Sequence, residues 1–183
     1  MSSQVSEAAQ QLVNSVERVA VVGAGTMGNG IAQVFAQAGY TVLIIDPFEG
    51  ALDRARGTIE NSLGRMVKKE KITAEAAETI LSRLTFEAGI EAAAGANWGI
   101  EAVPESEELK EKVISALDAQ IVDGGVIASN TSSISITRLA NYTGRPESFV
   151  GMHFMNPVPM MKLVEVIRGH KSSDTVVEAT LEL

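Results

Sequence analysis

The chain has 183 residues, of which 45% are hydrophobic and 21% charged, and this favours one globular domain with a packed core. The formal net charge of −8 at pH 7 argues against nucleic acid as a partner, because a surface that binds phosphate backbones needs an excess of Lys and Arg. Cysteine is absent and histidine occurs twice, which excludes disulfides, thiolate nucleophiles and cysteine-ligated zinc and leads us to expect no metal site.

The N-terminal seventeen residues are polar and include Glu7 and Glu17 but no Lys or Arg. Secretory and mitochondrial targeting segments need basic residues there, and no apolar run in the chain reaches the roughly 18 residues of a membrane span. We therefore expect a flexible segment over residues 1–17, no membrane partner and a cytoplasmic location.

From residue 18 onward the sequence predicts alternating strands and helices. Helical spacing of apolar residues predicts helices at 26–38 and 107–120. Short apolar runs predict buried strands at 19–22, 41–45, 98–103 and 126–129. This alternation is typical of an α/β fold of the Rossmann type, with a doubly wound, mostly parallel sheet between two layers of helices.

Two segments depart from a minimal alternation of this kind. Residues 48–83 read as two helices, at 49–69 and 73–83, and predict a helical hairpin that projects between strands. Near the C-terminus, the segment Asn156-Pro157-Val158-Pro159 joins predicted strands at 149–153 and 162–167. A last amphipathic helix begins after Asp174 and reaches the end of the chain.

A glycine-rich loop follows the first strand and opens the first of these helices. In a dinucleotide-binding loop, Gly23 makes the turn, Gly25 lets the backbone approach the pyrophosphate, and Gly28 allows close helix packing. Asp46 ends the second strand, where a carboxylate accepts hydrogen bonds from ribose hydroxyls and repels a 2′-phosphate, so NAD is favoured over NADP. The alternative is a glycine turn without a ligand.

Two polar residues of the last predicted strands are candidates for acid–base chemistry. His153 ends one strand, and Glu165 lies in the next on the same face as the apolar Leu163 and Ile167. A carboxylate on a buried face needs a partner, and a histidine from the neighbouring strand would supply one and become a general base of fixed tautomer. The alternative is a hydrogen-bonded core histidine and a Glu165 turned to solvent.

The segment Asn130-Thr131-Ser132-Ser133 follows a strand, so it lies at the carboxyl edge of the sheet, where open α/β sheets bind ligands. Its hydroxyl and amide groups could orient a carbonyl, or they could cap a short helix over 134–140. Neither a G-x-S-x-G elbow nor a P-loop occurs in the chain, which disfavours a hydrolase or a nucleotide triphosphatase.

A basic cluster interrupts the acidic chain at Arg65, Lys68, Lys69 and Lys71, and the first three lie on one helical face. A solvated helix surface and a site for a polyanionic part of a substrate are both compatible with this spacing.

Together, Gly-Ala-Gly-Thr-Met-Gly at 23–28, Ser-Asn-Thr-Ser-Ser at 129–133 and the run from Met152 to Glu165 resemble the 3-hydroxyacyl-CoA dehydrogenases, and most closely the bacterial 3-hydroxybutyryl-CoA dehydrogenases. The resemblance covers residues 17–183. It implies NAD as cofactor and reversible oxidation of a short-chain (S)-3-hydroxyacyl-CoA, such as 3-hydroxybutyryl-CoA, to the 3-oxoacyl-CoA.

The resemblance also assigns roles to individual residues. It makes His153 the general base, Glu165 its orienting partner and Ser132 a hydrogen bond to the substrate oxygen, and it places Ser62 and Lys69, with Arg65 and Lys68 beside them, at coenzyme A. The residues it implies at the cofactor are Gly23, Gly25, Thr26, Met27, Gly28, Asp46, Glu105, Lys110, Asn130, Ser132 and Asn156.

Proteins of this family continue into an all-helical domain of about 100 residues, the size of a small domain, that forms the far wall of the cleft and most of a homodimer interface. These 183 residues do not include that domain. We therefore expect residues 18–183 to be an isolated NAD-binding domain of low activity. The alternative hypotheses are an NAD-binding module without catalysis and a reductase for another 3-hydroxy acid that lacks coenzyme A.

Overall fold

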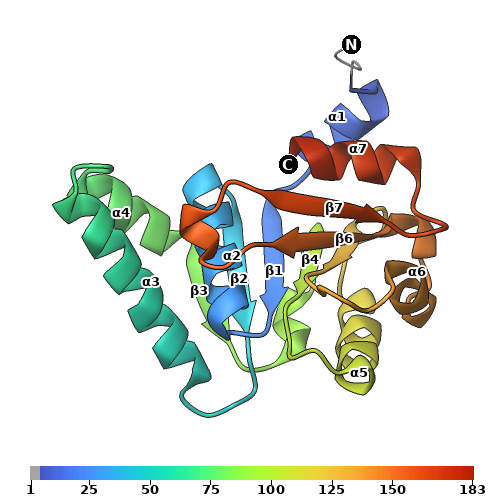
Figure 1. The fold of residues 1–183 in the computed structure, drawn as a ribbon, viewed down its shortest axis with the longest axis horizontal. Coiled ribbons are helices and arrows are strands. Elements are labelled where there is room, and N and C mark those ends of the chain that lie inside the picture. The colour runs from blue at the N-terminus through green and yellow to red at the C-terminus, as the bar shows by residue number, and fades with distance from the viewer. Residues whose placement is uncertain (1–4) are drawn as a thin grey trace.

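The computed structural model describes residues 5–183, and its strands form one sheet (Figure 1). The strands are β1 (Arg18–Val22), β2 (Thr41–Ile45), β3 (Leu84–Glu87), β4 (Trp98–Glu101), β5 (Val126–Ser129), β6 (Phe149–Phe154) and β7 (Val164–Arg168). Their order is β3-β2-β1-β4-β5-β6-β7, and all neighbours pair in parallel except β6 and β7. This confirms the predicted α/β fold with a doubly wound, mostly parallel sheet.

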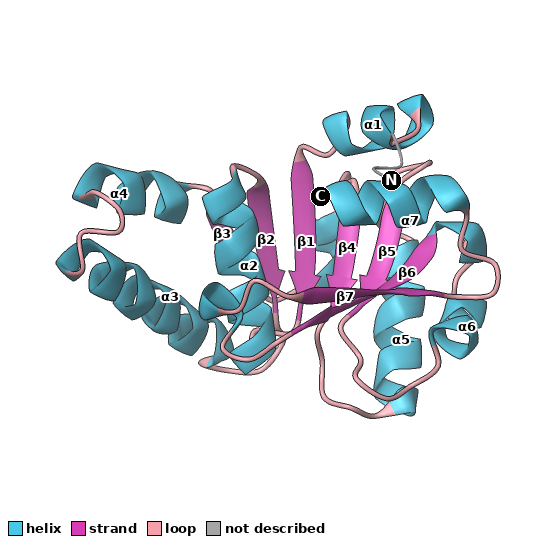
Figure 2. Ribbon diagram, turned by 45° about the horizontal axis from the view of Figure 1, so that its top comes forward, coloured by secondary structure: helices cyan, strands magenta, loops and turns pink. Residues whose placement is uncertain are grey.

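Helices cover both faces of the sheet (Figure 2). The α-helices are α1 (Glu7–Asn14), α2 (Thr26–Ala38), α3 (Ala51–Lys68), α4 (Ala74–Ser82), α5 (Glu107–Asp118), α6 (Ile136–Leu139) and α7 (Asp174–Glu182). Short 3₁₀ helices are η1 (Ile90–Ala93), η2 (Ala140–Tyr142), η3 (Pro146–Ser148) and η4 (Val158–Met160). No helix among residues 5–183 is both long enough and apolar enough to cross a membrane.

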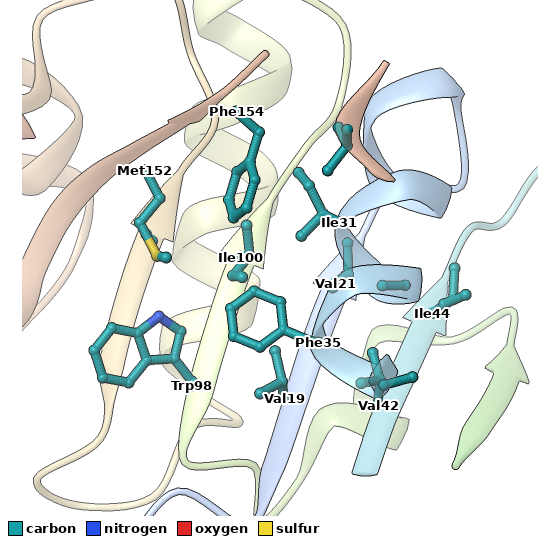
Figure 3. Packing of buried hydrophobic residues seen from close by; sticks show 14 of the residues in the cluster. Val19, Val21, Ile31, Phe35, Val42, Ile44, Trp98, Ile100, Met152 and Phe154 are labelled. Atoms are coloured by element: carbon teal, nitrogen blue, oxygen red, sulfur yellow. The ribbon is translucent and has the colours of Figure 1, made fainter. Parts of the chain in front are cut away.

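The alternation of side chains along the parallel strands creates two separate cores. Val19 and Val21 of β1 join the core beneath α2, which Figure 3 shows with Phe35 and Trp98. Ala20 and Val22 face the other way and join the core beneath α5 and α6. Strands buried on both faces in this manner hold the carboxyl ends of β1, β4 and β5 at fixed positions in the middle of the sheet.

The predicted helical hairpin is present as α3 and α4, which project beyond the edge of the sheet (Figure 1). It lies within the connection from β2 to β3. The sequence reading missed β3, whose four residues include only one buried apolar side chain, that of Leu84. Its pairing with β2, rather than a hydrophobic run of its own, makes it a strand.

The expectation of a flexible segment over residues 1–17 is wrong where the structure describes it. Ser6 caps α1, Ala9 is fully buried, and the Ser6 N–H donates to Glu178 Oε2 of α7 at 3.1 Å. Residues 1–17 are polar in overall composition, but α1 carries apolar residues at helical spacing. These residues become buried because α1 packs on α7 (Figure 1). Residues 1–4 lie outside the described residues.

Candidate active site

The loop between β1 and α2 has a backbone path that requires glycine at two positions. Gly23 has a φ of +104°, and a Cβ there would lie 2.6 Å from the Ala102 carbonyl oxygen. A Cβ at Gly28 would lie 1.7 Å from the Gly23 carbonyl oxygen. Both glycines therefore allow α2 to begin directly against the end of β1, as the sequence predicted.

Gly25 serves a different purpose, because a Cβ at this position would meet no atom within 4 Å. Gly25 is the N-cap of α2, and within residues 5–183 no side chain caps the first turn of that helix by a hydrogen bond. The free N–H groups and the positive end of the helix dipole consequently face open space at the carboxyl edge of the sheet. The residues present fit a dinucleotide whose pyrophosphate lies on this turn.

Asp46 follows β2 and bridges the loop to the next turn. Its Oδ2 accepts from the Ala24 N–H at 2.8 Å, and its Oδ1 accepts from the Phe48 N–H at 3.0 Å. Each oxygen keeps a further lone pair, which could accept from a ribose hydroxyl. Asp46 thus fixes the shape of the glycine loop and also presents its carboxylate to the adjoining cavity.

A cavity of about 680 Å³ runs along the carboxyl ends of β1, β4, β5 and β6. The predicted residues that line it are Gly23, Gly25, Thr26, Met27, Asp46, Glu105, Asn130, Ser132, His153 and Asn156. The sequence reading missed its apolar wall, to which Phe48, Val103, Leu109, Val113 and Phe154 contribute. Their positions in the sequence could have predicted this wall, because they lie on or shortly after the carboxyl ends of strands, or on the helix that follows β4.

Among the predicted cofactor residues, two do not line this cavity. Gly28 is buried beneath the loop, as its packing role requires. Lys110 is only 1% exposed, and its ammonium pairs with Glu101 at 2.7 Å and Glu105 at 3.3 Å. Lys110 therefore lies behind the cavity wall beside Glu105, and its contact with the cofactor stays a prediction.

His153 and Glu165 are directly opposite one another in the antiparallel pair of β6 and β7. The distance from His153 Nδ1 to Glu165 Oε2 is 2.8 Å. A carboxylate at Nδ1 favours the tautomer protonated there and leaves Nε2 as an acceptor. His153 lines the main cavity, so an imidazole oriented by a carboxylate, the arrangement that a general base needs, lies at the cavity wall.

The sequence predicted this pair on the ground that the Glu165 carboxylate lies on a buried face of its strand, and that ground is wrong. The Glu165 side chain is 53% exposed, and Leu163 and Ile167 on the same face are also exposed. The opposite face of β7, which carries Val164 and Val166, is the one that is partly buried. The pairing rests on strand register and not on a need to neutralise a buried carboxylate.

The segment 130–133 forms a loop beside His153. Asn130 Oδ1 accepts from the Phe154 N–H at 2.9 Å, which orients the amide of Asn130. Ser132 is exposed and lines both the main cavity and a second one of about 320 Å³ that reaches Glu165. Ser135 caps α6, whereas Thr131 Oγ1 accepts from the Ser133 N–H at 3.3 Å and the Ile134 N–H at 3.0 Å, so this segment caps the turn that precedes the helix and not the helix itself.

Glu105 connects this loop to the loop after β4. Its Oε1 accepts from the Thr131 hydroxyl, from the N–H groups of Ser132 and Ser133 at 3.2 Å each, and from Ser133 Oγ at 2.9 Å. Partial burial by itself raises the pKa of Glu105, but these hydrogen bonds and the Lys110 charge outweigh burial and place the pKa below its ordinary value. Glu105 is consequently a carboxylate at neutral pH.

The coenzyme A candidates lie on α3, away from the cavities just described. Arg65, Lys68 and Lys69 are exposed, and Ser62 is half-buried. Cations in the last turn of a helix also suit its dipole, so a solvated surface remains compatible with them. Within residues 5–183, no group of three or more His, Asp or Glu side chains could hold a metal ion.

Comparison with known proteins agrees with this geometry. Residues 18–183 match the family described as "3-hydroxyacyl-CoA dehydrogenase, NAD binding domain". The chain is 47% identical to a probable 3-hydroxybutyryl-CoA dehydrogenase of Deinococcus radiodurans over 88% of this chain and 58% of that protein. It is 41% identical to a fatty acid oxidation complex subunit alpha of Pseudomonas putida, over 96% of this chain and 24% of that protein.

Solved structures give the same result. The (S)-3-hydroxybutyryl-CoA dehydrogenase PaaH1 of Ralstonia eutropha is 44% identical, with a TM-score of 0.88 over 92% of this chain and 59% of that one. A 3-hydroxybutyryl-CoA dehydrogenase of Escherichia coli K12 is 43% identical, with a TM-score of 0.89 over 92% of this chain and 36% of that one. The chain thus spans about 58% of the length of a curated relative. It belongs to the 3-hydroxyacyl-CoA dehydrogenase family, and residues 18–183 are the NAD-binding domain of that family.

Proposed function

We propose that this chain carries the cofactor site and the catalytic base of an NAD-dependent dehydrogenase of (S)-3-hydroxyacyl-CoA. The observation that carries the proposal is the His153–Glu165 pair, joined at 2.8 Å, whose histidine lines the same cavity as the glycine loop and Asp46. A proton acceptor and a dinucleotide loop on one cavity suit the removal of a proton and a hydride from one alcohol.

In this proposal His153 Nε2 accepts the proton of the 3-hydroxyl group. NAD, when bound, supplies the hydride acceptor. Glu165, at Nδ1, stabilises the imidazolium that forms and keeps the ring in place, while Ser132 hydrogen-bonds the substrate oxygen as it becomes a carbonyl. The reverse reaction returns the proton from His153 to the oxygen of a 3-oxoacyl group.

For the substrate, we propose a short-chain acyl-CoA such as 3-hydroxybutyryl-CoA, oxidised to acetoacetyl-CoA. The names of the relatives support this class. The exposed cations of α3 provide a surface for the phosphates of coenzyme A, with Ser62 beside them. The homodimer and the cytoplasmic location stay predictions from the sequence.

The test is acetoacetyl-CoA-dependent oxidation of NADH, measured on this chain and on a version extended through the remaining length of its relatives. We expect NADH binding by both versions and rapid turnover by the extended one. An extended version that binds NADH but fails to oxidise it with acetoacetyl-CoA would favour the alternative of an NAD-binding module without catalysis.

A further inference from the structure

A further cavity, of about 390 Å³, adjoins the main cavity at the glycine loop, between the start of α2 and the first half of α3. The two cavities share four lining residues, which are Gly25, Thr26, Asp46 and Phe48. The residues that complete the wall of this α2–α3 cavity are Ala24, Asn29, Ala51, Arg54, Ala55 and Thr58. The roles proposed above for the main cavity do not use this space.

Asp46 lies at the boundary between the two cavities and fixes where the adenosine ribose of a bound dinucleotide would lie. Its carboxylate would accept hydrogen bonds from the ribose hydroxyls, so the 2′-oxygen would lie about 3 Å from it. The main cavity suits the dinucleotide itself. The α2–α3 cavity is consequently the space into which a substituent on the 2′-oxygen would project.

The charged residues in the wall of the α2–α3 cavity are Asp46 and Arg54. Side chains of a helix point back toward its N-terminus, and Arg54 does so on α3. A Cβ at Gly50, the N-cap of α3, would lie 3.0 Å from Arg54 Nη1. The guanidinium therefore lies against the turn between β2 and α3, where Asp46 accepts from the Phe48 N–H.

The charge of Arg54 is not used within the described part of the chain. Among residues 5–183, the arginines that form ion pairs with carboxylates are Arg138, Arg145 and Arg168. Asp46 shares the cavity with Arg54 but directs both of its oxygens to backbone N–H groups, those of Ala24 and Phe48. An exposed guanidinium with five donors is thus left beside a cavity that is continuous with the cofactor site.

The rest of the wall offers further hydrogen-bond donors. Asn29 is only 9% exposed, and its Nδ2 donates one proton to the Gly25 carbonyl oxygen at 2.6 Å, which leaves the second proton of that amide. Thr26 is exposed and contributes a hydroxyl at the positive end of α2. An arginine, neutral donors and a helix N-terminus are the groups that bind a phosphate.

We propose that the α2–α3 cavity is a site for a phosphate monoester on the 2′-oxygen of the adenosine ribose, and that Arg54 is the residue that binds it. Asp46 favours NADH, but Arg54 offsets part of its repulsion, so the chain retains a weaker affinity for NADPH. The inference goes beyond the proposed function, which needs only NAD, and it rests on that function in placing a dinucleotide in the main cavity.

The experiment compares Arg54→Gln with Arg56→Gln, a matched control that removes the same charge from the same helix. Arg56 is exposed and does not line the α2–α3 cavity, and its guanidinium lies 4.2 Å from the centre of the Phe86 ring. Dissociation constants for NADH and NADPH are measured on this chain by fluorescence titration at low salt. Thermal unfolding verifies that each variant is folded.

Three nucleotides that compete with NADH locate the phosphate. They are adenosine 5′-monophosphate, adenosine 2′,5′-bisphosphate and adenosine 3′,5′-bisphosphate. The two bisphosphates have the same charge and differ in the position of one phosphate, and the 3′,5′ isomer is the adenosine end of coenzyme A. The comparison therefore separates a 2′-phosphate of the cofactor from a phosphate of the acyl carrier.

We expect Arg54→Gln to weaken binding of NADPH and of adenosine 2′,5′-bisphosphate about fivefold, the effect of one exposed charge pair. NADH, the monophosphate and the 3′,5′-bisphosphate should change less than about twofold. Arg56→Gln should change all five ligands less than about twofold. Added salt should diminish the effect of Arg54→Gln, because the charges are exposed.

Four results would overturn the proposal. Unchanged NADPH binding in Arg54→Gln would show a solvated side chain, and an equal loss for NADH would show contact with a part common to both cofactors. An equal loss in Arg56→Gln would show only the general field of α3. A loss for the 3′,5′-bisphosphate as large as that for the 2′,5′ isomer would assign Arg54 to coenzyme A or to unspecific attraction.

The outcome for the proposed function is separate. If NADH binds but the extended version does not oxidise it with acetoacetyl-CoA, the dehydrogenase proposal fails, and the comparison of Arg54→Gln with Arg56→Gln still decides the 2′-phosphate site. If the unaltered chain binds neither NADH nor NADPH, both proposals fail together.

Discussion

Two glycines of the same loop, Gly25 and Gly28, should respond differently to alanine. Gly28→Ala places a Cβ 1.7 Å from the Gly23 carbonyl oxygen, so we expect the free energy of unfolding to fall by about 3 kcal/mol. Gly25→Ala meets no protein atom, but its methyl group projects into the space that suits a pyrophosphate. It should fold normally and bind NADH at least about tenfold more weakly, a loss of about 1.4 kcal/mol.

Thermal unfolding and fluorescence titration with NADH measure these two effects separately. Gly57→Ala in α3 is the control, since a Cβ there also meets nothing within 4 Å and lies in a helix interior. It should leave NADH affinity unchanged. Normal NADH binding by Gly25→Ala would contradict the assignment of this turn to the pyrophosphate.

Asp46 should control the choice between NADH and NADPH. Asp46→Asn keeps the size of the side chain and removes the charge that repels a 2′-phosphate. We expect the ratio of the dissociation constants for NADPH and NADH to fall about tenfold, because a hydrogen bond to a charged group contributes about 1.5–3 kcal/mol. Titration of both cofactors checks this. Asp53→Asn, on the exposed first turn of α3, is the control of equal charge change. Tighter binding of NADPH than NADH by the unaltered chain would refute this role.

His153 and Glu165 should affect turnover far more than cofactor binding. In the extended version, His153→Ala should lower kcat by about 10² to 10⁴, the usual contribution of a positioned base. Glu165→Gln should lower it less, because Nδ1 retains a hydrogen-bond partner. NADH affinity should stay within about threefold of the original in both, since a change of that size is under 1 kcal/mol.

The chain offers a control for this prediction in its second histidine. His170 is exposed in the turn before α7, and His170→Ala should leave kcat unchanged. If His153→Ala turns over acetoacetyl-CoA as fast as His170→Ala, His153 is not the base.

At the scale of elements, α3 should bind the phosphates of coenzyme A. In the extended version, Lys69→Ala should raise the KM for acetoacetyl-CoA at low salt by up to about fivefold, because exposed charge pairs contribute no more than about 1 kcal/mol each. The effect should diminish as salt screens the charges. Lys171→Ala, which removes an exposed cation from the turn before α7, is the control. Equal KM values for the two variants at low salt would contradict phosphate binding by α3 and would favour the alternative of a solvated helix surface.

The hairpin also shows which features of an element the sequence predicts. The helical spacing of apolar residues and the residues that start and stop helices predicted its two helices within two residues of the observed bounds. Both signals depend only on neighbouring residues in the sequence. Strand β3 and helix α1 were not predicted. Each has few buried apolar residues, and each is stabilised by a neighbour distant in sequence: β3 by β2, and α1 by α7.

At the scale of the whole molecule, the site is open. The His153 side chain is 22% exposed and the Glu165 side chain 53% exposed, so water has access to this pair. Exclusion of water acts mainly on the transition state. We therefore expect this chain to bind NADH nearly as tightly as the extended version does but to turn over at least about 100-fold more slowly.

Isothermal titration with NADH and the oxidation assay on both versions check this difference. Equal kcat values would show that residues 1–183 alone close the site sufficiently. A much weaker NADH affinity in this chain would show instead that the cofactor site itself is incomplete.

The sequence by itself determined the order of the strands and helices other than β3 and α1, the glycine loop and the acid after β2. Each is encoded locally: four apolar residues make a buried strand, and a turn with a φ of +104° at Gly23 accepts only glycine readily. The residues of the loop after β5 were also placed correctly, because the carboxyl end of a parallel strand has a known position in such a sheet.

Only the tertiary structure decided how side chains from different segments meet. The register of β6 and β7 joins His153 to an exposed Glu165, which alternation along a single strand could not foresee. Packing of α5 buries Lys110 and pairs its ammonium with Glu101, a contact between two segments that the sequence did not predict. Contacts of this kind depend on distances between segments that pair or pack only after folding, and no local spacing in the sequence specifies them.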